Sequence, residues 1–348
     1  MVNSDRAEVG VDSVRDSQSS ELLPESCYHV LREERYTELS SSLEKNQYIV
    51  LDNFLGGKFS KALRAEMIAH KADFEPHKYE FSGNILPKPG ISEMDLSDKT
   101  QLSKFGPDDS VTLLHETVSK LIAENIRTLC PWLHISTDKA PSIKLQFNNG
   151  GCFPWHYDAA GVGARRRLTC VYYLNPDWRE GDGGEIVLMP FGRAHKKIAP
   201  AMDRCVIFLS EYVNHRVLLA KPHIDVERRR MAISMWFDAE SGKLVDKEQE
   251  ISMADACKMA DDDVMMNRIM WSKQLQQSLS RAIYSDLYLE SMDESVAGSR
   301  EARAHLQNMN AAHHAHVQKV MGLPQGRELI EVCQEFTAEQ RDDAEEDL

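Results

Sequence analysis

The sequence has no long hydrophobic run. No stretch approaches the roughly 20 consecutive apolar residues that a membrane-spanning helix requires, and residues 1–20 lack the apolar segment of a secretory signal. The seven cysteines include no CxxC pair, which disfavours a structural zinc ribbon and fits reduced thiols. We therefore expect a protein of the cytoplasm or nucleus that has no membrane partner.

Positive charge is also scarce. The chain has 41 Lys and Arg against 55 Asp and Glu, which gives a formal net charge of -14. A negative field of this kind repels phosphate backbones, so nucleic acid is not expected as a partner. Residues 150–240 are the exception, with 13 Lys and Arg against 11 Asp and Glu, and this segment could hold a small anion.

The hydrophobic pattern divides the 348 residues into three regions. Residues 1–25 are polar, and we expect them to be disordered. Residues 26–240 are expected to form one domain that begins with supporting helices; within it, residues 79–107 scatter Gly, Pro and Ser without a period, as in a long loop or flap. Residues 241–348 return to a helical period and end in RDDAEEDL, which predicts a helical extension with a solvated acidic tail.

The fold class follows from the middle of the chain. From residue 142 the pattern has period two, because Ile143, Leu145 and Phe147 alternate with polar residues, as in a half-buried strand. Four more apolar bursts follow without helices between them: LTCVYYL, GEIVLM, RCVIFLS and MAISMWF. This spacing predicts a mostly β protein with a jelly-roll (double-stranded β-helix) core over residues 142–238.

The sequence CFPWHYDAAG places His156 and Asp158 at positions i and i+2, which share one face of a strand. A second His-x-Asp pair begins at His223, but it follows a proline in a charged loop, and we interpret it as solvated. Candidates for a third ligand are His195, His215 and His223, and we favour His215 because it follows a predicted strand that would lie beside the first pair. Two histidines and one carboxylate form the facial arrangement of non-haem Fe(II) oxygenases.

The last predicted strand, RMAISMWF, carries an anion-binding pattern. Arg230, Ser234 and Trp236 share one face of an otherwise apolar strand. Such a placement is costly unless the guanidinium meets an anion. Two alternatives remain open: Arg230 only ends a basic surface run, or the extra residues at 217–229 shift the register so that Arg229 is the anion partner.

Taken together, these motifs resemble the 2-oxoglutarate- and Fe(II)-dependent dioxygenases. A His-x-Asp pair, a later His, and an Arg with a hydroxyl four residues on occur in the expected order over residues 142–238. The segments TCVYYLNPDW, GGEIVLMP, DRCVIFLS and RMAISMWF are similar to the prolyl 4-hydroxylase branch, and YIVLDNFL with its following helix resembles the N-terminal support of that branch.

The resemblance implies roles for particular residues. Three would coordinate Fe(II): His156, Asp158 and His215. Three would bind the distal carboxylate of 2-oxoglutarate: Arg230, Ser234 and Tyr173. Tyr173 could instead be a core aromatic of its strand, and Trp236 either walls the pocket or packs in the core. Gln146 stands where some prolyl hydroxylases carry a Tyr, so it is a further pocket candidate.

The resemblance also implies an activity. With dioxygen, and ascorbate as reductant, such an enzyme would hydroxylate a C–H bond and release succinate and carbon dioxide. The resemblance to the prolyl 4-hydroxylase branch implies that this bond belongs to a prolyl residue in a protein or peptide. Two alternatives stay open: a catalytically silent jelly roll that acts as a binding or scaffold protein, and an oxygenase of the same chemistry with a non-peptide substrate. The run Arg165–Arg167 could meet an acidic substrate, although such runs are usually solvated turns.

Overall fold

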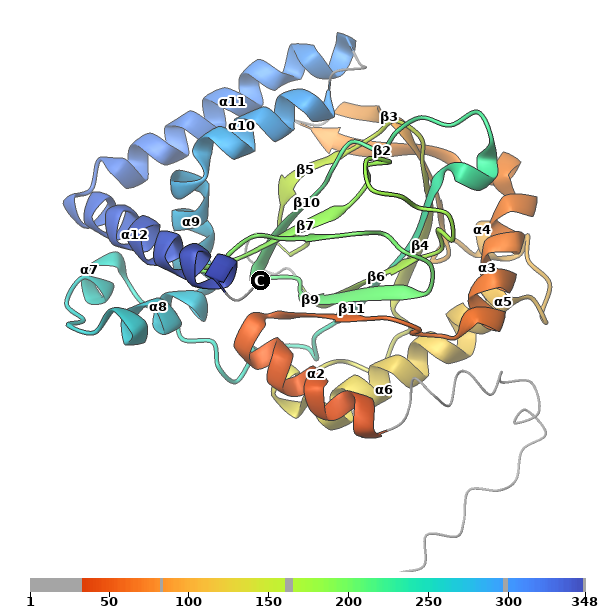
Figure 1. Ribbon diagram of the computed structural model, residues 1–348, viewed down its shortest axis with the longest axis horizontal. Coiled ribbons are helices and arrows are strands. Elements are labelled where there is room, and N and C mark those ends of the chain that lie inside the picture. The colour runs from red at the N-terminus through yellow and green to blue at the C-terminus, as the bar shows by residue number, and fades with distance from the viewer. Residues whose placement is uncertain (1–32, 82–83, 160–164, 297–299, 347–348) are drawn as a thin grey trace, which may run out of the picture.

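The computed structural model describes residues 33–81, 84–159, 165–296 and 300–346 (Figure 1). The segment expected to be disordered, residues 1–25, lies outside the described residues. Figure 1 shows the strands at the centre, the N-terminal helices on one side and the C-terminal helices, in blue, on another. Among the described residues, no helix is long and apolar enough to cross a membrane.

The centre consists of two antiparallel sheets, which confirms the predicted jelly roll. The larger sheet has seven strands in the order β1 (Tyr48–Leu51), β9 (Arg204–Leu209), β6 (Arg166–Tyr173), β11 (Arg230–Asp238), β4 (Ser142–Asn148), β3 (Asn84–Asp95) and β2 (Glu75–Phe81). The smaller sheet has four strands in the order β5 (Phe153–His156), β10 (Val213–Val217), β7 (Ile186–Pro190) and β8 (Lys196–Ile198).

The alternation within β4 and β11 separates the core from the pocket. Ile143, Leu145 and Phe147 of β4 belong to the main hydrophobic core, whereas Lys144 and Gln146 between them line a pocket between the sheets. Strand β11 follows the same rule, since its odd-numbered residues lie in the core and its even-numbered ones toward the pocket. The period-two pattern therefore predicts the faces of both strands.

Helices cover the outer face of the larger sheet. Their residues join the same core as the odd-numbered residues of β4 and β11. The main ones are α2 (Glu33–Asn46), α3 (Gly57–Ala69) and α6 (Ser119–Leu129). The shorter segments are α4 (Lys99–Leu102), α5 (Ser110–Leu113), a π-helical turn (Leu114–Val118) and single 3₁₀ turns at Lys71–Asp73, Pro131–Leu133 and Val226–Arg228.

The segment 79–107 is not the irregular loop that its composition suggests. Strands β2 and β3 pair as an antiparallel hairpin, and β3 pairs with β4, so most of the segment extends the larger sheet. Pro76 is compatible with β2 because β2 is the edge of the sheet, and Pro87 is compatible with β3 because it precedes Ile91, where the pairing of β3 with β4 begins. Residues of both strands line the pocket: His77 on β2, and Lys88 and Glu93 on β3.

The C-terminal extension is helical as predicted, and its helices pack on the smaller sheet. They are α7 (Met253–Ala256), α8 (Asp262–Met270), α9 (Lys273–Ile283), α10 (Ser285–Ser295), α11 (Arg300–Met321) and α12 (Pro324–Glu346). Tyr284 and Tyr288 of this region pack against Trp155 of β5 and Met189 of β7. The extension therefore supports the strand that carries His156.

The helical extension stays packed on the domain close to the predicted acidic tail, residues 341–348, and Thr337 is still buried. Helix α12 runs to Glu346, and Leu329, Ile330 and Cys333 are buried against α8 and α9. The few apolar residues among many charges escape notice in the composition, yet they fall three or four positions apart and form one helical face.

Helix α12 should therefore stabilise the fold. Leu329 is 1% exposed, so Leu329→Ala should lower the free energy of unfolding by about 2–5 kcal/mol through lost packing. Leu323, just before α12, is 45% exposed, so Leu323→Ala should change the free energy of unfolding by less than about 0.5 kcal/mol. Urea denaturation of both variants checks this. Equal unfolding midpoints would show that α12 is not part of the folded core.

Candidate active site

A pocket of about 1200 Å³ opens between the two sheets. Strands β4, β6 and β11 of the larger sheet form one wall, β5 and β10 form the opposite wall, and the β2–β3 hairpin closes one side. All the residues that the sequence singles out as metal or cosubstrate ligands except Tyr173 line this pocket.

Three potential metal ligands converge in the pocket. Strands β5 and β10 pair so that His156 lies directly opposite His215, and Asp158 follows β5 by two residues. The Asp158 Oδ1 atom is 3.5 Å from His156 Nε2 and 3.8 Å from His215 Nε2. One ligand atom from each residue lies within 4.8 Å of the other two, which suits a single metal ion.

Hydrogen bonds to the backbone fix how both histidines present their rings. The Nδ1 atom of His156 lies 2.8 Å from the carbonyl oxygen of Pro154, and that of His215 lies 3.3 Å from the carbonyl oxygen of Val213. A carbonyl oxygen only accepts, so each Nδ1 donates and carries the proton. This arrangement leaves Nε2, the atom directed at Asp158 in each ring, as the nitrogen that can bind a metal.

The protonation state of His215 agrees with this role. Burial, followed by the charge of His156, lowers the pKa of His215 to about 4, and Asp158 opposes the change only in part. His215 is therefore neutral at pH 7 and offers a lone pair.

Asp158 is held as a carboxylate by two side-chain donors. Thr169 Oγ1 donates a hydrogen bond to Asp158 Oδ2 at 2.7 Å, and Trp236 Nε1 donates to the same oxygen at 2.9 Å. Burial alone would raise the pKa of Asp158, but His215, His156 and the Thr169 bond outweigh it and hold the pKa far below its ordinary value. Because both donors occupy Oδ2, the Oδ1 atom stays directed at the histidines.

The role of Trp236 was missed in the sequence, where it could only be a pocket wall or a core aromatic. The face that Trp236 shares with Arg230 predicts that its side chain points to the pocket. The indole bond to Asp158 depends on the pairing between β11 and β6, which puts Trp236 opposite Thr169. This register brings both donors to one carboxylate oxygen.

Arg230 lies at the inner end of the pocket. Its side chain is 5% exposed, its Nε donates to the carbonyl oxygen of Gly184 at 2.6 Å, and its guanidinium carbon is 5.1 Å from the centre of the Tyr173 ring. Its Nη1 atom and the hydroxyl of Tyr173 are buried and make no hydrogen bond with the described residues. Burial lowers the pKa of Arg230 but leaves it a cation, and no carboxylate of the described residues forms an ion pair with it.

These unsatisfied groups fit a carboxylate ligand. A buried guanidinium without an anion is costly, and a carboxylate would accept from both Nη1 and the tyrosine hydroxyl. Ser234, four residues after Arg230 on the same face of β11, also lines the pocket. So does Gln146 of β4, which pairs with Ala232 of β11. The pocket therefore combines a ligand set suited to Fe(II) with a carboxylate site suited to the far end of 2-oxoglutarate.

Gly184 keeps Arg230 in place. Its φ is +76°, and an added Cβ atom would lie 2.5 Å from Arg230 Cδ. Gly184→Ala should displace the guanidinium and weaken 2-oxoglutarate binding by roughly tenfold to a hundredfold, measurable by calorimetry with a redox-inert divalent metal. Gly242 has nearly the same φ, +75°, with open space around it, so Gly242→Ala should leave that affinity unchanged. Equal losses in both variants would contradict the positioning role of Gly184.

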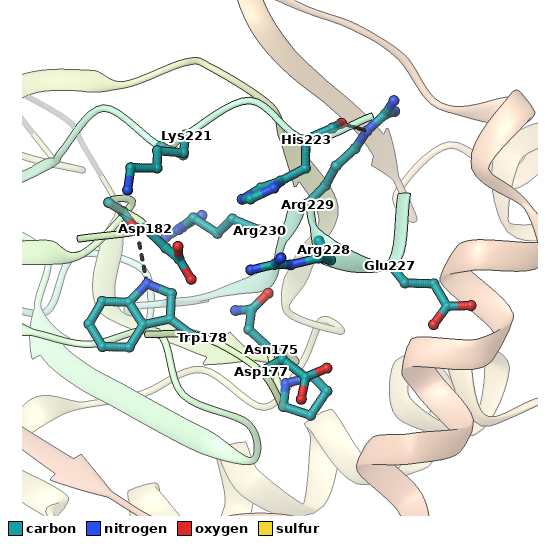
Figure 2. Close-up of a pocket in the computed structure, with 13 residues that line it drawn as sticks. Asn175, Asp177, Trp178, Asp182, Lys221, His223, Glu227, Arg228, Arg229 and Arg230 are labelled. Carbon is teal, nitrogen blue, oxygen red and sulfur yellow. Dashed lines mark hydrogen bonds between the residues drawn. The ribbon is translucent and has the colours of Figure 1, made fainter. Parts of the chain in front are cut away.

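The other sequence candidates lie elsewhere. The ring of His195 packs against Trp155 and Tyr284, and His223 lines a separate cavity of about 400 Å³. Figure 2 shows that Arg229 and Arg230 extend in different directions, with Arg229 Nε donating to the carbonyl oxygen of His223 at 3.1 Å. The extra residues at 217–229 therefore leave the β11 register intact, and Arg230 is the arginine that enters the pocket.

The last two arginines of the run Arg165–Arg167 belong to strand β6 and not to a solvated turn. Arg167 is buried and forms an ion pair with Glu211, which also accepts from Lys273 at 2.6 Å. Arg166 lies with its guanidinium 4.4 Å from the centre of the Trp236 ring. Arg167 thus ties the larger sheet to the C-terminal helices, whereas Arg166 lines the active-site pocket beside Trp236.

Comparison with known proteins gives a consistent result. Residues 143–238 match the profile of the 2OG-Fe(II) oxygenase superfamily. A solved prolyl 4-hydroxylase from Phytophthora capsici superimposes with a TM-score of 0.70 at 28% identity, over 90% of this chain and 95% of that one.

Among curated proteins, the chain is 29% identical to Egl nine homolog 1 of Rattus norvegicus and of Homo sapiens over 205 residues. These residues are 57% of this chain, 57% of the rat protein and 45% of the human protein, so the chain spans about half the length of the curated relatives it matches.

Proposed function

We propose that this chain, which belongs to the prolyl 4-hydroxylase-like branch of the 2-oxoglutarate- and Fe(II)-dependent oxygenases, hydroxylates a prolyl residue in a protein or peptide. The reaction would consume dioxygen and 2-oxoglutarate and release succinate and carbon dioxide. The observation that carries the proposal is one pocket that holds both the His156–Asp158–His215 cluster and the unpaired Arg230 guanidinium.

Each side chain has a distinct part in this proposal. Fe(II), when bound, would supply the chelation of the keto acid and the activation of dioxygen. Thr169 and Trp236 orient Asp158 through its Oδ2 atom, and the carbonyl bonds of the two histidines keep Nε2 free for the metal. Arg230, Tyr173 and Ser234 would bind and orient the distal carboxylate of 2-oxoglutarate, and Gly184 positions Arg230.

The support for a peptide substrate is the similarity to prolyl 4-hydroxylases. Ascorbate would serve as the reductant that restores Fe(II). We further propose that the chain acts in the cytoplasm or nucleus, because seven cysteines without paired spacing suit a reducing compartment. Localisation of the tagged full chain by cell fractionation checks this.

The two other functions give different results in one experiment. The protein is incubated with Fe(II), 2-oxoglutarate, ascorbate and a pool of proline-containing peptides, and both succinate and peptide masses are measured. We expect succinate together with a gain of one oxygen on a proline, absent from the same peptides with alanine in place of proline. A silent scaffold would form no succinate, and an oxygenase with a non-peptide substrate would form succinate without modifying any peptide.

A further inference from the structure

Lys88 is a buried cation in the active-site pocket that the proposed chemistry does not use. It lies on β3, is 8% exposed, and its Nζ atom is 3.9 Å from the centre of the Phe153 ring. It forms no ion pair with a carboxylate among the described residues. By contrast Lys144, which lines the same pocket, is bonded to Glu93 at 2.7 Å.

The surroundings of Lys88 do not neutralise its charge. Glu93, an acidic residue of the same pocket, already accepts from His77 and from Lys144, each at 2.7 Å. Burial lowers the pKa of Lys88 to about 8, so it remains mostly charged at pH 7. A buried charge with only an aromatic face beside it is costly, and an anionic ligand would relieve that cost.

Lys88 also lines a second hollow, a groove beside β3. Its apolar walls are three prolines and two aromatic rings: Pro76, Pro87, Pro89, Phe74 and Phe147. Two more cations line it, Lys71 and Arg229, and no Asp or Glu is among its lining residues. In a chain with a net charge of -14, this groove is a local concentration of positive charge.

The cations of the groove are held in place by groups that carry no negative charge. Lys71 Nζ lies 5.1 Å from the centre of the Phe147 ring and bonds only to the hydroxyl of Ser92, at 3.4 Å, among the described residues. Arg229 donates to the carbonyl oxygens of His223 and Ile224. Burial, and then the charge of Arg229, lowers the pKa of Lys71. Lys71 and Arg229 therefore repel each other, and an anionic partner bound between them would relieve this repulsion.

We infer that the substrate is an acidic peptide: an Asp or Glu beside the target proline pairs with Lys88, and the chain continues along the groove past Lys71 and Arg229. The apolar walls suit an extended segment, and the three cations suit carboxylates spaced along it. This inference rests on the proposed prolyl hydroxylation for the reaction, but the acid preference itself is a property of binding.

The test uses pairs of short rhodamine-labelled peptides with one central proline. Each pair carries a single Glu or a single Gln at the same flanking position, and the position is scanned. Binding to the full chain is followed by fluorescence anisotropy, and turnover by succinate release. We expect Glu to be bound about tenfold or more tightly than Gln at one or two neighbouring positions.

Variants assign that preference to Lys88. Lys88→Met removes the charge with similar volume and should abolish the difference between Glu and Gln, whereas Lys88→Arg should retain it. The control is Lys78→Gln, which removes one charge from the same hairpin. The Lys78 side chain is 58% exposed, so this variant should keep the preference for Glu over Gln. If Lys88→Met does not fold, the double variant Lys71→Gln with Arg229→Gln should still weaken the preference in the full chain.

The outcomes separate this inference from the proposed function. Equal binding of Glu and Gln peptides at every position, or a preference that survives in folded Lys88→Met, would overturn the acidic-peptide inference even if proline is hydroxylated. A Lys88-dependent preference without any peptide modification would support it and count against prolyl hydroxylation instead.

Discussion

Asp158→Ala should abolish 2-oxoglutarate turnover and most of the divalent metal affinity of the protein. Asp158 supplies the only carboxylate of the His156–Asp158–His215 cluster, and its Oδ1 atom is the one directed at both histidines. Replacing a residue that merely orients a ligand costs roughly tenfold to a hundredfold in affinity, so loss of the ligand itself should cost more. Titration with Mn(II), followed by electron paramagnetic resonance, measures the affinity without turnover.

The control for this prediction is His223→Ala. His223 begins the second His-x-Asp pair in the sequence, but it lines the separate cavity beyond Arg230. Its replacement should leave both metal affinity and turnover unchanged. Wild-type metal binding in a folded Asp158→Ala variant, or its loss in His223→Ala, would mean that the metal site has been assigned to the wrong residues.

Arg230→Ala should weaken 2-oxoglutarate binding by about a hundredfold or more, or some 2.7 kcal/mol at about 1.4 kcal/mol per tenfold. The guanidinium is buried and its Nη1 atom lacks a partner among the described residues, so the bond to the ligand would be dry and charge-assisted. Arg230→Lys restores the charge without the planar fork and should be intermediate. Ser234→Ala removes one neutral donor and should cost about tenfold or less.

Arg229→Ala is the matched control for this series. Arg229 is adjacent in sequence, yet its side chain extends in a different direction from that of Arg230 (Figure 2) and does not line the active-site pocket. It donates instead to the carbonyl oxygens of His223 and Ile224. Calorimetric titration of 2-oxoglutarate into the four variants should therefore find wild-type affinity only in Arg229→Ala. If Arg229→Ala were the damaging change and Arg230→Ala silent, the anion site would lie outside the pocket.

Most of the site residues that were predicted correctly were identified from the side-chain period of the strands. A side-chain period of two decides which residues of β4 and β11 face the pocket, so the common face of Arg230, Ser234 and Trp236 could be read directly. The choice of His215 needed one further step, the expectation that its strand returns beside His156. The pairing of β5 with β10 confirms that expectation.

The features that could not be predicted from the sequence depend on contacts between segments that are far apart in the chain. The bonds of Thr169 and Trp236 to Asp158 arise from the β6–β11 register, for which no local pattern exists. The β2–β3 hairpin was hidden by its prolines, which are tolerated on the edge strand β2 and on the part of β3 that does not pair with β4. The buried face of α12 was hidden by the surrounding charges, and burial of Arg167 follows from Glu211 in a loop far along the chain.

The central claim is that this pocket couples 2-oxoglutarate oxidation to the use of dioxygen, and isotope labelling tests it most directly. The protein is supplied with Fe(II), 2-oxoglutarate, a proline-containing peptide that it modifies and heavy-oxygen dioxygen in ordinary water, and both succinate and the peptide are analysed by mass spectrometry. We predict that each succinate carries one heavy oxygen atom and that a hydroxylated peptide carries the other. Succinate without the label, or 2-oxoglutarate consumption that continues without dioxygen, would contradict the account.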